Sequence, residues 1–457
     1  MARKEGNHQM GRGWEKQSSS WEWVVDVEKM LAGDDPDSRR KEAQRWAAQS
    51  IYRVPEWLKG TNSKAYKPQL VSLGPFHHGD PNLVPMEEHK RRALVHLIKR
   101  SQKPLQDFIS AIDEVAEVLQ GAYGRDLNDE WRDDRRSFVN MMLTDGCFLL
   151  EMMIDTFLDY EPHDPVFSKR GRTCINCVIL PDMLLLENQL PLLLLKKILL
   201  VLRPHYLGAF ESRHEVEMDG KINLVVLDFL GRTDEGRDMA NMSLRHHPLQ
   251  LYHGSLTYKE AAHEVPQESE SKEYKYEMMP STLEMHEAGI KFRKSERDNL
   301  LGIDFKGGLL TMPAIAVDDG AESLYLNLMA FERLHCNVGD LVTAYVFFMD
   351  DMIVSSNDVA ILSSKGVLEN LLGCDKEVAK LFNGTLNRGQ LLSPWHALHD
   401  VQSKVNAYCR KPRHKWRATL LRTYFRNPWA IISLAAAVIL LIATLLQTIF
   451  TIMPNRS

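Results

Sequence analysis

The segment Leu184–Leu202, LLLENQLPLLLLKKILLVL, decides how the surrounding chain folds. Leucine dominates it, but the apolar run is broken at Glu187, Asn188, Gln189, Pro191, Lys196 and Lys197. This density of polar residues and the proline argue against a membrane span. Because proline lacks a backbone N–H and clashes with the preceding turn, the pattern predicts a helix break at Pro191 within a buried pair of helices.

Helical periodicity extends outward from this segment in both directions. Apolar residues recur at helical spacing over 108–119, 138–157, 324–335, 341–354 and 376–382. A different pattern covers 289–317, where short apolar runs at 290–292, 303–305 and 309–317 are separated by charged or Gly-Gly turns. Such runs predict a small antiparallel sheet.

The C-terminal stretch Trp429–Met453, WAIISLAAAVILLIATLLQTIFTIM, contains no charged side chain. At ~1.5 Å per residue it would form a helix of about 37 Å, enough to cross a ~30 Å hydrocarbon core. Asn427 suits an N-cap and Pro428 the first helical position. We therefore expect a tail-anchored protein that is mainly α with a small antiparallel β element (α+β): a single large helical domain plus one C-terminal transmembrane helix.

Composition divides the chain into five parts. They are a polar, largely disordered N-terminus at 1–45 with a short helix near 20–32, a helical domain at 46–425, a polar and disordered insert within it at 231–280, a basic juxtamembrane segment at 401–426, and the transmembrane helix at 429–453. The N-terminus has no apolar core of the kind that a secretory signal requires. The six cysteines are compatible with a reducing compartment.

Charge is distributed unevenly along the chain. The net charge is −5, and residues from Val401 onward contribute nine Lys or Arg and no Asp or Glu, so residues 1–400 carry −14, since −14 + 9 = −5. The positive-inside rule then predicts a single-pass protein of the plasma membrane or endomembranes, with its large domain in the cytosol. The residues expected to contact anionic lipid of the inner leaflet are Arg410, Lys411, Arg413, Lys415, Arg417, Arg422 and Arg426. The alternative is that this basic run is a solvated helix face.

Polar residues also recur within the apolar C-terminal stretch. Thr444, Gln447, Thr448 and Thr451 lie three to four residues apart, on one helix face. Polar groups in lipid find partners on neighbouring helices, so Gln447 is a candidate for association between transmembrane helices.

The sequence contains few signatures of catalysis. Phosphate-binding loops, dinucleotide-binding loops, the serine elbow and the zinc motif H-E-x-x-H are missing from it. We predict no catalytic residues, no cofactor, no metal and no nucleic-acid partner. An alternative is a metal or acid–base site made by His77, His78, Glu87 and His89. A Pro/Gly-bounded loop fixed by its imidazoles would use the same residues structurally.

Four carboxylates interrupt apolar segments. They are Asp145, Glu151, Asp182 and Glu187. A buried unpaired charge is costly, so we expect each to find a partner, with Arg53, Lys90 and Arg136 as candidates. Catalysis by paired carboxylates is the alternative interpretation.

A series of short motifs, in a fixed order, covers about 50–453. They are Ile51-Tyr-Arg-Val-Pro55, Tyr66-Lys-Pro68, Val71-Ser-Leu-Gly-Pro-Phe-His-His78, Met86-Glu87-x-His89-Lys90, Asp145-Gly-Cys-Phe-Leu-Leu-Glu151, Asp182-x-Leu-Leu-Leu-Glu-Asn-Gln-Leu-Pro191, Glu287-Ala-Gly-Ile-x-Phe292, Asn327-Leu-x-Ala-Phe-Glu332 and Asn427-Pro-Trp429. With these motifs the chain resembles the plant proteins that contain "domain of unknown function 247". The insert at 231–280 has no clear counterpart in that pattern.

The resemblance implies a plant protein that is largely helical, has a C-terminal membrane anchor and has no established enzymatic activity. Some grass relatives are associated with self-incompatibility, where they look like recognition determinants. The signature positions that it implies here are Pro75, His77, His78, Glu87, His89, Asp145, Glu151, Glu187, Asn188 and Gln189.

We therefore predict a non-catalytic, membrane-anchored recognition or signalling protein that binds an unidentified protein partner. The alternatives are a membrane-bound, metal-dependent hydrolase that uses the His77/His78/Glu87/His89 cluster, and a purely architectural scaffold.

Overall fold

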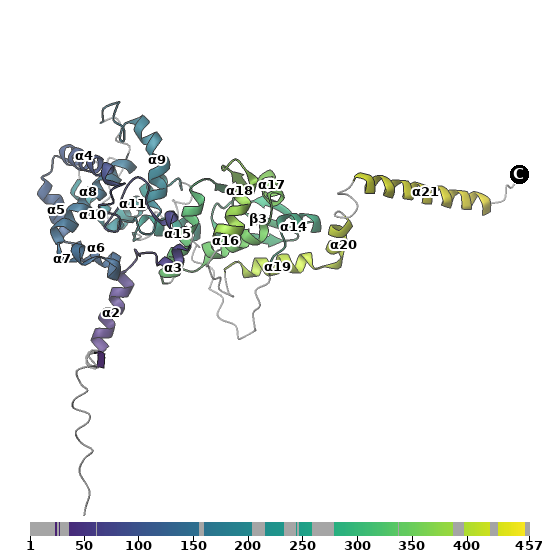
Figure 1. The fold of residues 1–457 in the computed structure, drawn as a ribbon, viewed down its shortest axis with the longest axis horizontal. Coiled ribbons are helices and arrows are strands. Elements are labelled where there is room, and N and C mark those ends of the chain that lie inside the picture. Colours follow the sequence, from purple (N-terminus) through teal and green to yellow (C-terminus); the bar gives the residue numbers. More distant parts are fainter. Residues whose placement is uncertain are drawn as a thin grey trace, which may run out of the picture.

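The computed structural model describes residues 36–60, 62–154, 160–202, 215–232, 246–257, 278–336, 338–386, 397–420 and 428–452, together with residues 23, 24, 27 and 244. Within these ranges the chain is mainly helical, as predicted (Figure 1). The helices of the first half are α2 (Pro36–Ala48), α3 (Glu56–Lys59), η2 (Ser63–Tyr66), α4 (Val84–Ser101), α5 (Leu105–Asp113), α6 (Ala116–Tyr123), η3 (Gly124–Asp126), α7 (Asp129–Asp133), α8 (Arg135–Met153), α9 (Lys169–Met183), α10 (Leu192–Leu202) and α11 (Glu215–Phe229). Those of the second half are α13 (Pro248–Thr257), α14 (Thr282–Ala288), η5 (Leu300–Gly302), α15 (Ala321–Leu334), α16 (Leu341–Met352), α17 (Ser356–Ser364), α18 (Asp375–Lys380), η6 (Leu381–Leu386), α19 (His399–Cys409), α20 (Pro412–Leu420) and α21 (Pro428–Ile452).

Helix α8 is the centre of the first group of helices. The side chain of Asp134 caps its first turn by accepting a hydrogen bond from Ser137 N at 3.0 Å. From Phe138 to Met152 nearly every side chain is buried, because α4, α5 and α10 pack around this helix. A helix that is apolar on all sides belongs in the middle of a core. The helix predicted over 138–157 is therefore confirmed as far as Met153.

The second group of helices surrounds two small sheets (Figure 1). The strands are β1 (Lys291–Lys294), β2 (Asp304–Lys306), β3 (Leu309–Met312), β4 (Ile315–Val317) and β5 (Leu368–Asn370). β2 and β3 pair antiparallel, but β1 pairs with β3, and β4 with β5, in parallel. The prediction of an antiparallel sheet is thus only partly right. The chain between β1 and β3 contains η5 and β2, and this connection is long enough to return β3 in the direction of β1.

Three further segments differ from the prediction. The helix expected over 108–119 is two helices, α5 and α6, because Val115 has non-helical backbone angles. The helix pair expected around Pro191 is a non-helical loop from Leu184 to Leu190 followed by α10. The polar insert at 231–280 contains the buried helix α13, and the N-terminal part predicted to be disordered contains α2. Residues 233–243, 245 and 258–277 of that insert and most of the predicted helix at 20–32 lie outside the described residues.

The two groups of helices meet at α15, which lies between them in Figure 1. α15 packs against η2 of the first half and against α16 of the second. Asn327 on α15 accepts a hydrogen bond from Leu186 N at 2.8 Å and donates one to Ala65 O at 2.8 Å. The buried apolar side chains of both groups form one continuous cluster. One core therefore holds the described part of the domain together.

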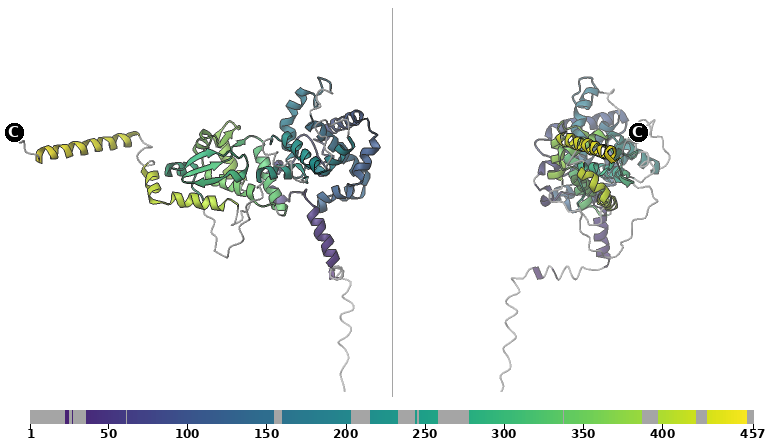
Figure 2. Two further views of the ribbon diagram at one scale, coloured as in Figure 1. Left: turned by 180° about the vertical axis from the view of Figure 1, so that it is seen from behind. Right: turned by 90° about the vertical axis from the view of Figure 1, so that its right-hand side faces the viewer.

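α21 extends away from both groups of helices (Figure 1 and Figure 2). Among the described residues, no helix combines the length and apolar character needed to cross a membrane. This finding corrects the predicted transmembrane helix at 429–453 and the predicted single-pass membrane localisation.

The polar face predicted in α21 has partners within its own helix. The hydroxyl groups of Thr444, Thr448 and Thr451 donate to the carbonyl oxygens of Leu440, Thr444 and Gln447, at 2.7 to 2.8 Å. Gln447 itself is exposed. The threonines are therefore satisfied without a second helix.

Candidate functional site

The loop from Leu184 to Pro191 is buried between α9 and α10 and carries three consecutive polar side chains, Glu187, Asn188 and Gln189. Each is directed at a different segment of the chain. Buried polar groups need hydrogen-bond partners, and these partners come from distant parts of the sequence. Together with Asp182 at the end of α9, the three side chains form what we call the polar hub.

Asp182 and Asn188 hold the extended segment at 69–73. Asp182 Oδ1 accepts from Gln69 N at 2.8 Å, and its Oδ2 accepts from the backbone N–H groups of residues 70 and 71 at 2.8 and 2.9 Å. Asn188 Oδ1 accepts from Leu73 N at 2.7 Å, while its Nδ2 donates to Val71 O at 3.0 Å. The side chains of Asp182 and Asn188 thus satisfy backbone groups of this extended segment that a neighbouring β-strand would otherwise satisfy. Burial raises the pKa of Asp182, although the three backbone donors oppose that rise.

Glu187 fixes the segment before α3. Its Oε1 accepts from Val54 N at 2.7 Å and lies 3.2 Å from Lys59 Nζ, while its Oε2 lies 3.5 Å from His77 Nε2. Burial favours the protonated form, but the contacts with His77, Lys59 and Val54 outweigh it and lower the pKa of Glu187. Glu187 therefore stays ionised as part of a partly buried charge cluster.

Gln189 connects the loop to α13 and α6. Its Nε2 donates to Met183 O at 2.6 Å, and its Oε1 accepts from Leu249 N at 2.9 Å and lies 3.1 Å from His247 Nδ1. The carbonyl oxygen of Gln189 accepts from the Tyr123 hydroxyl at 2.8 Å. Burial lowers the pKa of His247 to about 3, so this imidazole is neutral at physiological pH. His247 was not identified from the sequence as a buried site residue. The sequence feature that could have indicated it is the pair His246-His247 directly before Pro248.

A buried ion cluster lies beside the hub, where α4 crosses α8. Lys90 Nζ lies 2.8 Å from Asp145 Oδ1 and 2.6 Å from Glu87 Oε1, and it donates to the Ser72 hydroxyl at 3.0 Å. Asp145 Oδ2 accepts from Gly74 N at 2.8 Å. Burial raises the pKa of Asp145, and Lys90 counteracts this effect. Lys90, one of the three candidate partners named for the four carboxylates, thus pairs with Asp145.

The other two candidate cations, Arg53 and Arg136, do not pair with the four carboxylates among the described contacts. Glu151 is paired with Arg100 and accepts from the Tyr160 hydroxyl at 2.9 Å. Arg53 N and Nε instead donate to the side chain and backbone of Asp126, and Arg136 is exposed.

The four residues of the alternative metal site do not converge. His77 faces Glu187, while the ring of His78 meets the edge of Trp131 with centroids 5.1 Å apart. Glu87 pairs with Lys90, and His89 Nδ1 lies 2.7 Å from Arg92 Nη1. Pro75 is buried in the loop before them. Within the described ranges, no three His, Cys, Asp or Glu side chains gather in a way that could hold a metal ion.

The basic segment has several different surroundings. Lys411 and Arg413 line a recess at α19, and the side chain of Arg417 reaches Gly289 at the end of α14. Arg410 is exposed at the end of α19. Arg422, Arg426 and the side chain of Lys415 lie outside what the structure describes.

The arrangement of the hub indicates its chemical role. Its oxygens accept hydrogen bonds from backbone N–H groups or face cations, and its amide nitrogens donate to backbone carbonyl groups. Such side chains position loops, because satisfied buried polar networks specify one arrangement of the core. Seven of the ten signature positions lie in or directly beside the hub; His78, His89 and Glu151 do not.

A family profile described as "Plant protein of unknown function", DUF247, matches residues 51–443. The UPF0481 protein At3g47200 of Arabidopsis thaliana is 27% identical over 428 residues, which cover 88% of this chain and 86% of the relative. The putative UPF0481 protein At3g02645 of the same plant is 23% identical and covers 93% of each chain. No solved structure matches the chain. Since the profile spans most of its length and the motifs occur in order, this chain belongs to the DUF247 family of plant proteins.

Proposed function

We propose that this protein is a non-catalytic recognition protein that acts by binding another protein. The observation that carries the proposal is a groove of about 1400 Å³ between α2 and α6, here called the α2–α6 groove. The polar hub supports it as well, because the signature side chains of the hub have structural partners and therefore serve to hold the scaffold in shape.

The floor of the α2–α6 groove is apolar and depends on the hub. Pro191, the last residue of the hub loop, and Leu193 at the start of α10 line it together with Leu119, Ala122 and Leu127. Val118 on α6 is 62% exposed at its edge. Exposed apolar surface in a concave position is typical of a site that another molecule covers.

Trp46 provides an anchor in this groove. It lies on α2, is 56% exposed and has the guanidinium carbon of Arg125 5.6 Å from its ring centroid. Arg125 also pairs with Glu42 at 2.5 Å. Tryptophan and arginine are the residues that most often dominate binding energy in protein interfaces.

The charge of the groove specifies the partner further. Its charged lining residues are Lys41, Glu42, Arg45, Glu117, Arg125 and Arg132. Cations thus outnumber carboxylates. A partner helix that carries an apolar stripe between acidic residues complements this surface. Self-incompatibility, which the resemblance implies for some grass relatives, is one process that uses recognition of this kind.

The test compares two tryptophans in the full-length protein. Trp57 is a matched control, because it is 60% exposed and the guanidinium carbon of Arg333 lies 4.9 Å from its ring centroid, but it does not line the groove. Proteins captured from plant extract by the wild type are identified, and their affinities are measured with each variant. We expect Trp46→Ala to weaken binding by about 2 kcal/mol, roughly thirtyfold, while Trp57→Ala leaves it unchanged. Equal binding by the wild type and Trp46→Ala would refute the proposal.

A further inference from the structure

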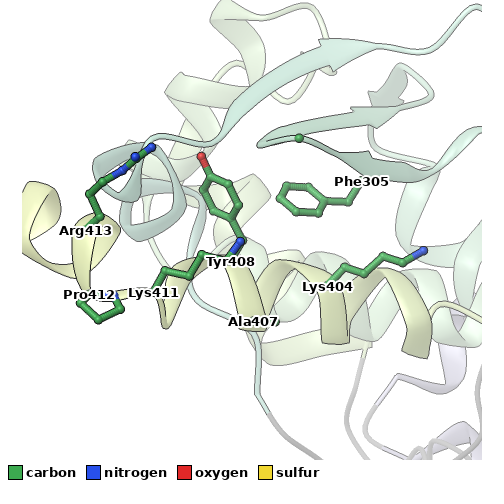
Figure 3. Close-up of a pocket in the computed structure, with 8 residues that line it drawn as sticks. Phe305, Lys404, Ala407, Tyr408, Lys411, Pro412 and Arg413 are labelled. Carbon is green, nitrogen blue, oxygen red and sulfur yellow. The ribbon is translucent and has the colours of Figure 1, made fainter.

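A second concave site lies at the other end of the domain, between the β2–β3 hairpin and the helices α19 and α20 (Figure 3). Its volume is about 840 Å³. The residues that line it are Phe305, Gly307, Lys404, Ala407, Tyr408, Lys411, Pro412 and Arg413. We call it the basic recess.

The spacing of its residues explains why three cations meet there. Lys404, Tyr408 and Lys411 lie at positions i, i+4 and i+7 of the chain, which places them on one face of α19 and its end. Pro412 begins the next helix and brings Arg413 to the same side. Figure 3 shows Arg413 and Lys404 at opposite ends of the recess, with the aromatic rings between them.

Aromatic packing gives the recess a defined wall. The rings of Phe305 and Tyr408 meet edge to face with centroids 5.5 Å apart. Gly308 has a φ of +86°, and a Cβ there would lie 2.6 Å from the Tyr408 hydroxyl oxygen. This glycine thus allows the ring to pack directly against the hairpin. The wall is part of the folded domain, so the cations stand on a fixed support.

The recess has a positive charge excess. Among the described residues that line it, none carries a carboxylate. The acidic residues closest to it in the chain are Asp400, which accepts from Lys404 Nζ at 2.6 Å, and Asp304, which pairs with Lys306 at 2.6 Å. Lys411 Nζ lies 5.7 Å from the centroid of the Tyr408 ring. Lys404 is therefore partly neutralised, and Lys411 and Arg413 supply most of the excess.

We propose that the basic recess binds a small molecule that carries several phosphate groups. Lys404 lies on α19 and Lys411 lies just beyond its last residue, Cys409; the helix from Lys404 to Cys409 alone rises about 7.5 Å, so one phosphate does not contact both ends. Arg413 presents a planar fork that fits phosphate oxygens, and lysine binds phosphate as a point charge. The volume lies within the range of about 300–1,000 Å³ that small-molecule sites occupy.

This inference is independent of the proposed protein partner, because the α2–α6 groove and the basic recess share no lining residue. Inositol hexakisphosphate is a suitable probe, and its binding to the full-length protein is measured by isothermal titration calorimetry at physiological salt. We expect this probe to bind far more tightly than inorganic phosphate, because only the former spans the recess.

Two charge reversals make the test specific. Lys411→Glu removes a cation from the recess, whereas Arg410→Glu makes the same change one residue earlier, outside the lining. Both side chains are exposed, so both variants should fold, which circular dichroism verifies. We expect Lys411→Glu to weaken binding of the probe at least about tenfold, the loss of one charge-assisted contact, and Arg410→Glu to weaken it only about twofold through general charge.

Three results would overturn the inference. The first is a wild-type protein that does not bind the soluble probe. The second is equal weakening of binding by both reversals, which would indicate general attraction to a basic chain. The third is binding to phosphatidylcholine vesicles that contain a phosphoinositide, together with failure to bind the soluble polyphosphate.

Discussion

Replacement of Lys90 by methionine removes the only cation within ion-pair distance of Asp145 among the described residues. Lys90 is 0% exposed, and its ammonium group contacts Asp145, Glu87 and Ser72. Methionine has a similar length and fills the same space, so the substitution isolates the charge. The Gly74 N–H still donates to Asp145 in the variant.

The expected cost follows from the burial of the carboxylate that remains. Removal of one partner from a buried ion pair destabilises a protein by about 3–5 kcal/mol, because the other charge stays in a poorly solvating site. Most domains have a free energy of unfolding of only about 5–15 kcal/mol. The Lys90→Met variant should therefore be folded but markedly less stable.

The effect should depend on pH. Burial already raises the pKa of Asp145, and loss of Lys90 raises it further. A carboxyl group with a higher pKa in the folded than in the unfolded state destabilises the fold as pH rises from the unfolded value, about 3.9, towards the folded value. The cost of Lys90→Met is thus smallest near pH 4, roughly the unfolded pKa, and grows as pH increases towards neutrality.

Urea denaturation followed by circular dichroism measures these differences on the full-length protein. Lys306→Met is the control, because the Lys306–Asp304 pair is exposed and should contribute little. Adding Asp145→Asn to Lys90→Met should restore part of the loss, since the neutral amide has no charge to bury. A cost below about 1 kcal/mol, or one that is the same at acidic and neutral pH, would contradict this account of the cluster.

Three further predictions concern the polar hub. Asp182→Ala leaves three backbone N–H groups without their acceptor. Urea denaturation should show that the free energy of unfolding falls by about 3–5 kcal/mol. A cost below about 1 kcal/mol would contradict the role of Asp182 in holding the segment at 69–71. Gly74→Ala should lower the melting temperature much more than Gly79→Ala. Both glycines have positive φ, of +79° and +84°, but only at Gly74 would a Cβ meet other atoms, 2.8 Å from Gln189 O; equal effects of the two would argue against close packing there. The pKa of His247, about 3 in the folded state, lies below its unfolded value, so the free energy of unfolding should decrease as pH falls below about 6.5. The NMR signal of this imidazole should stay that of the neutral form down to about pH 4. A titration midpoint near pH 6.5 would show that the imidazole is not buried.

Local patterns were sufficient for most helices. The apolar spacing in α8, α15 and α16 predicted these elements, because helix formation depends on neighbours three and four residues apart. The same reasoning failed where long-range contacts decide the conformation. The leucines at 184–186 look helical, yet they form a loop, since the partners of Glu187, Asn188 and Gln189 can be reached only from an irregular backbone.

The candidate site shows the same division. The sequence identified Glu187 and Asp145 as buried carboxylates that need partners, and it named Lys90 among three candidates, but only the structure assigned Lys90 to Asp145. It suggested a cluster of His77, His78 and His89, but their side chains face different neighbours. Adjacent histidines on a loop point in different directions, and no spacing rule predicts which groups will surround them.

The sequence by itself determined the largely helical class, the family membership through ordered motifs, and the contrast between an acidic body and a basic C-terminal segment. These properties depend on composition and on short-range order along the chain. Only the tertiary structure decided that Asp182 supports a segment more than a hundred residues away, and that Trp46 and Lys411 line concave surfaces at opposite ends of the domain. Hydrogen bonds and grooves join residues that are distant in the chain, and their geometry arises only when the packed core brings those residues together.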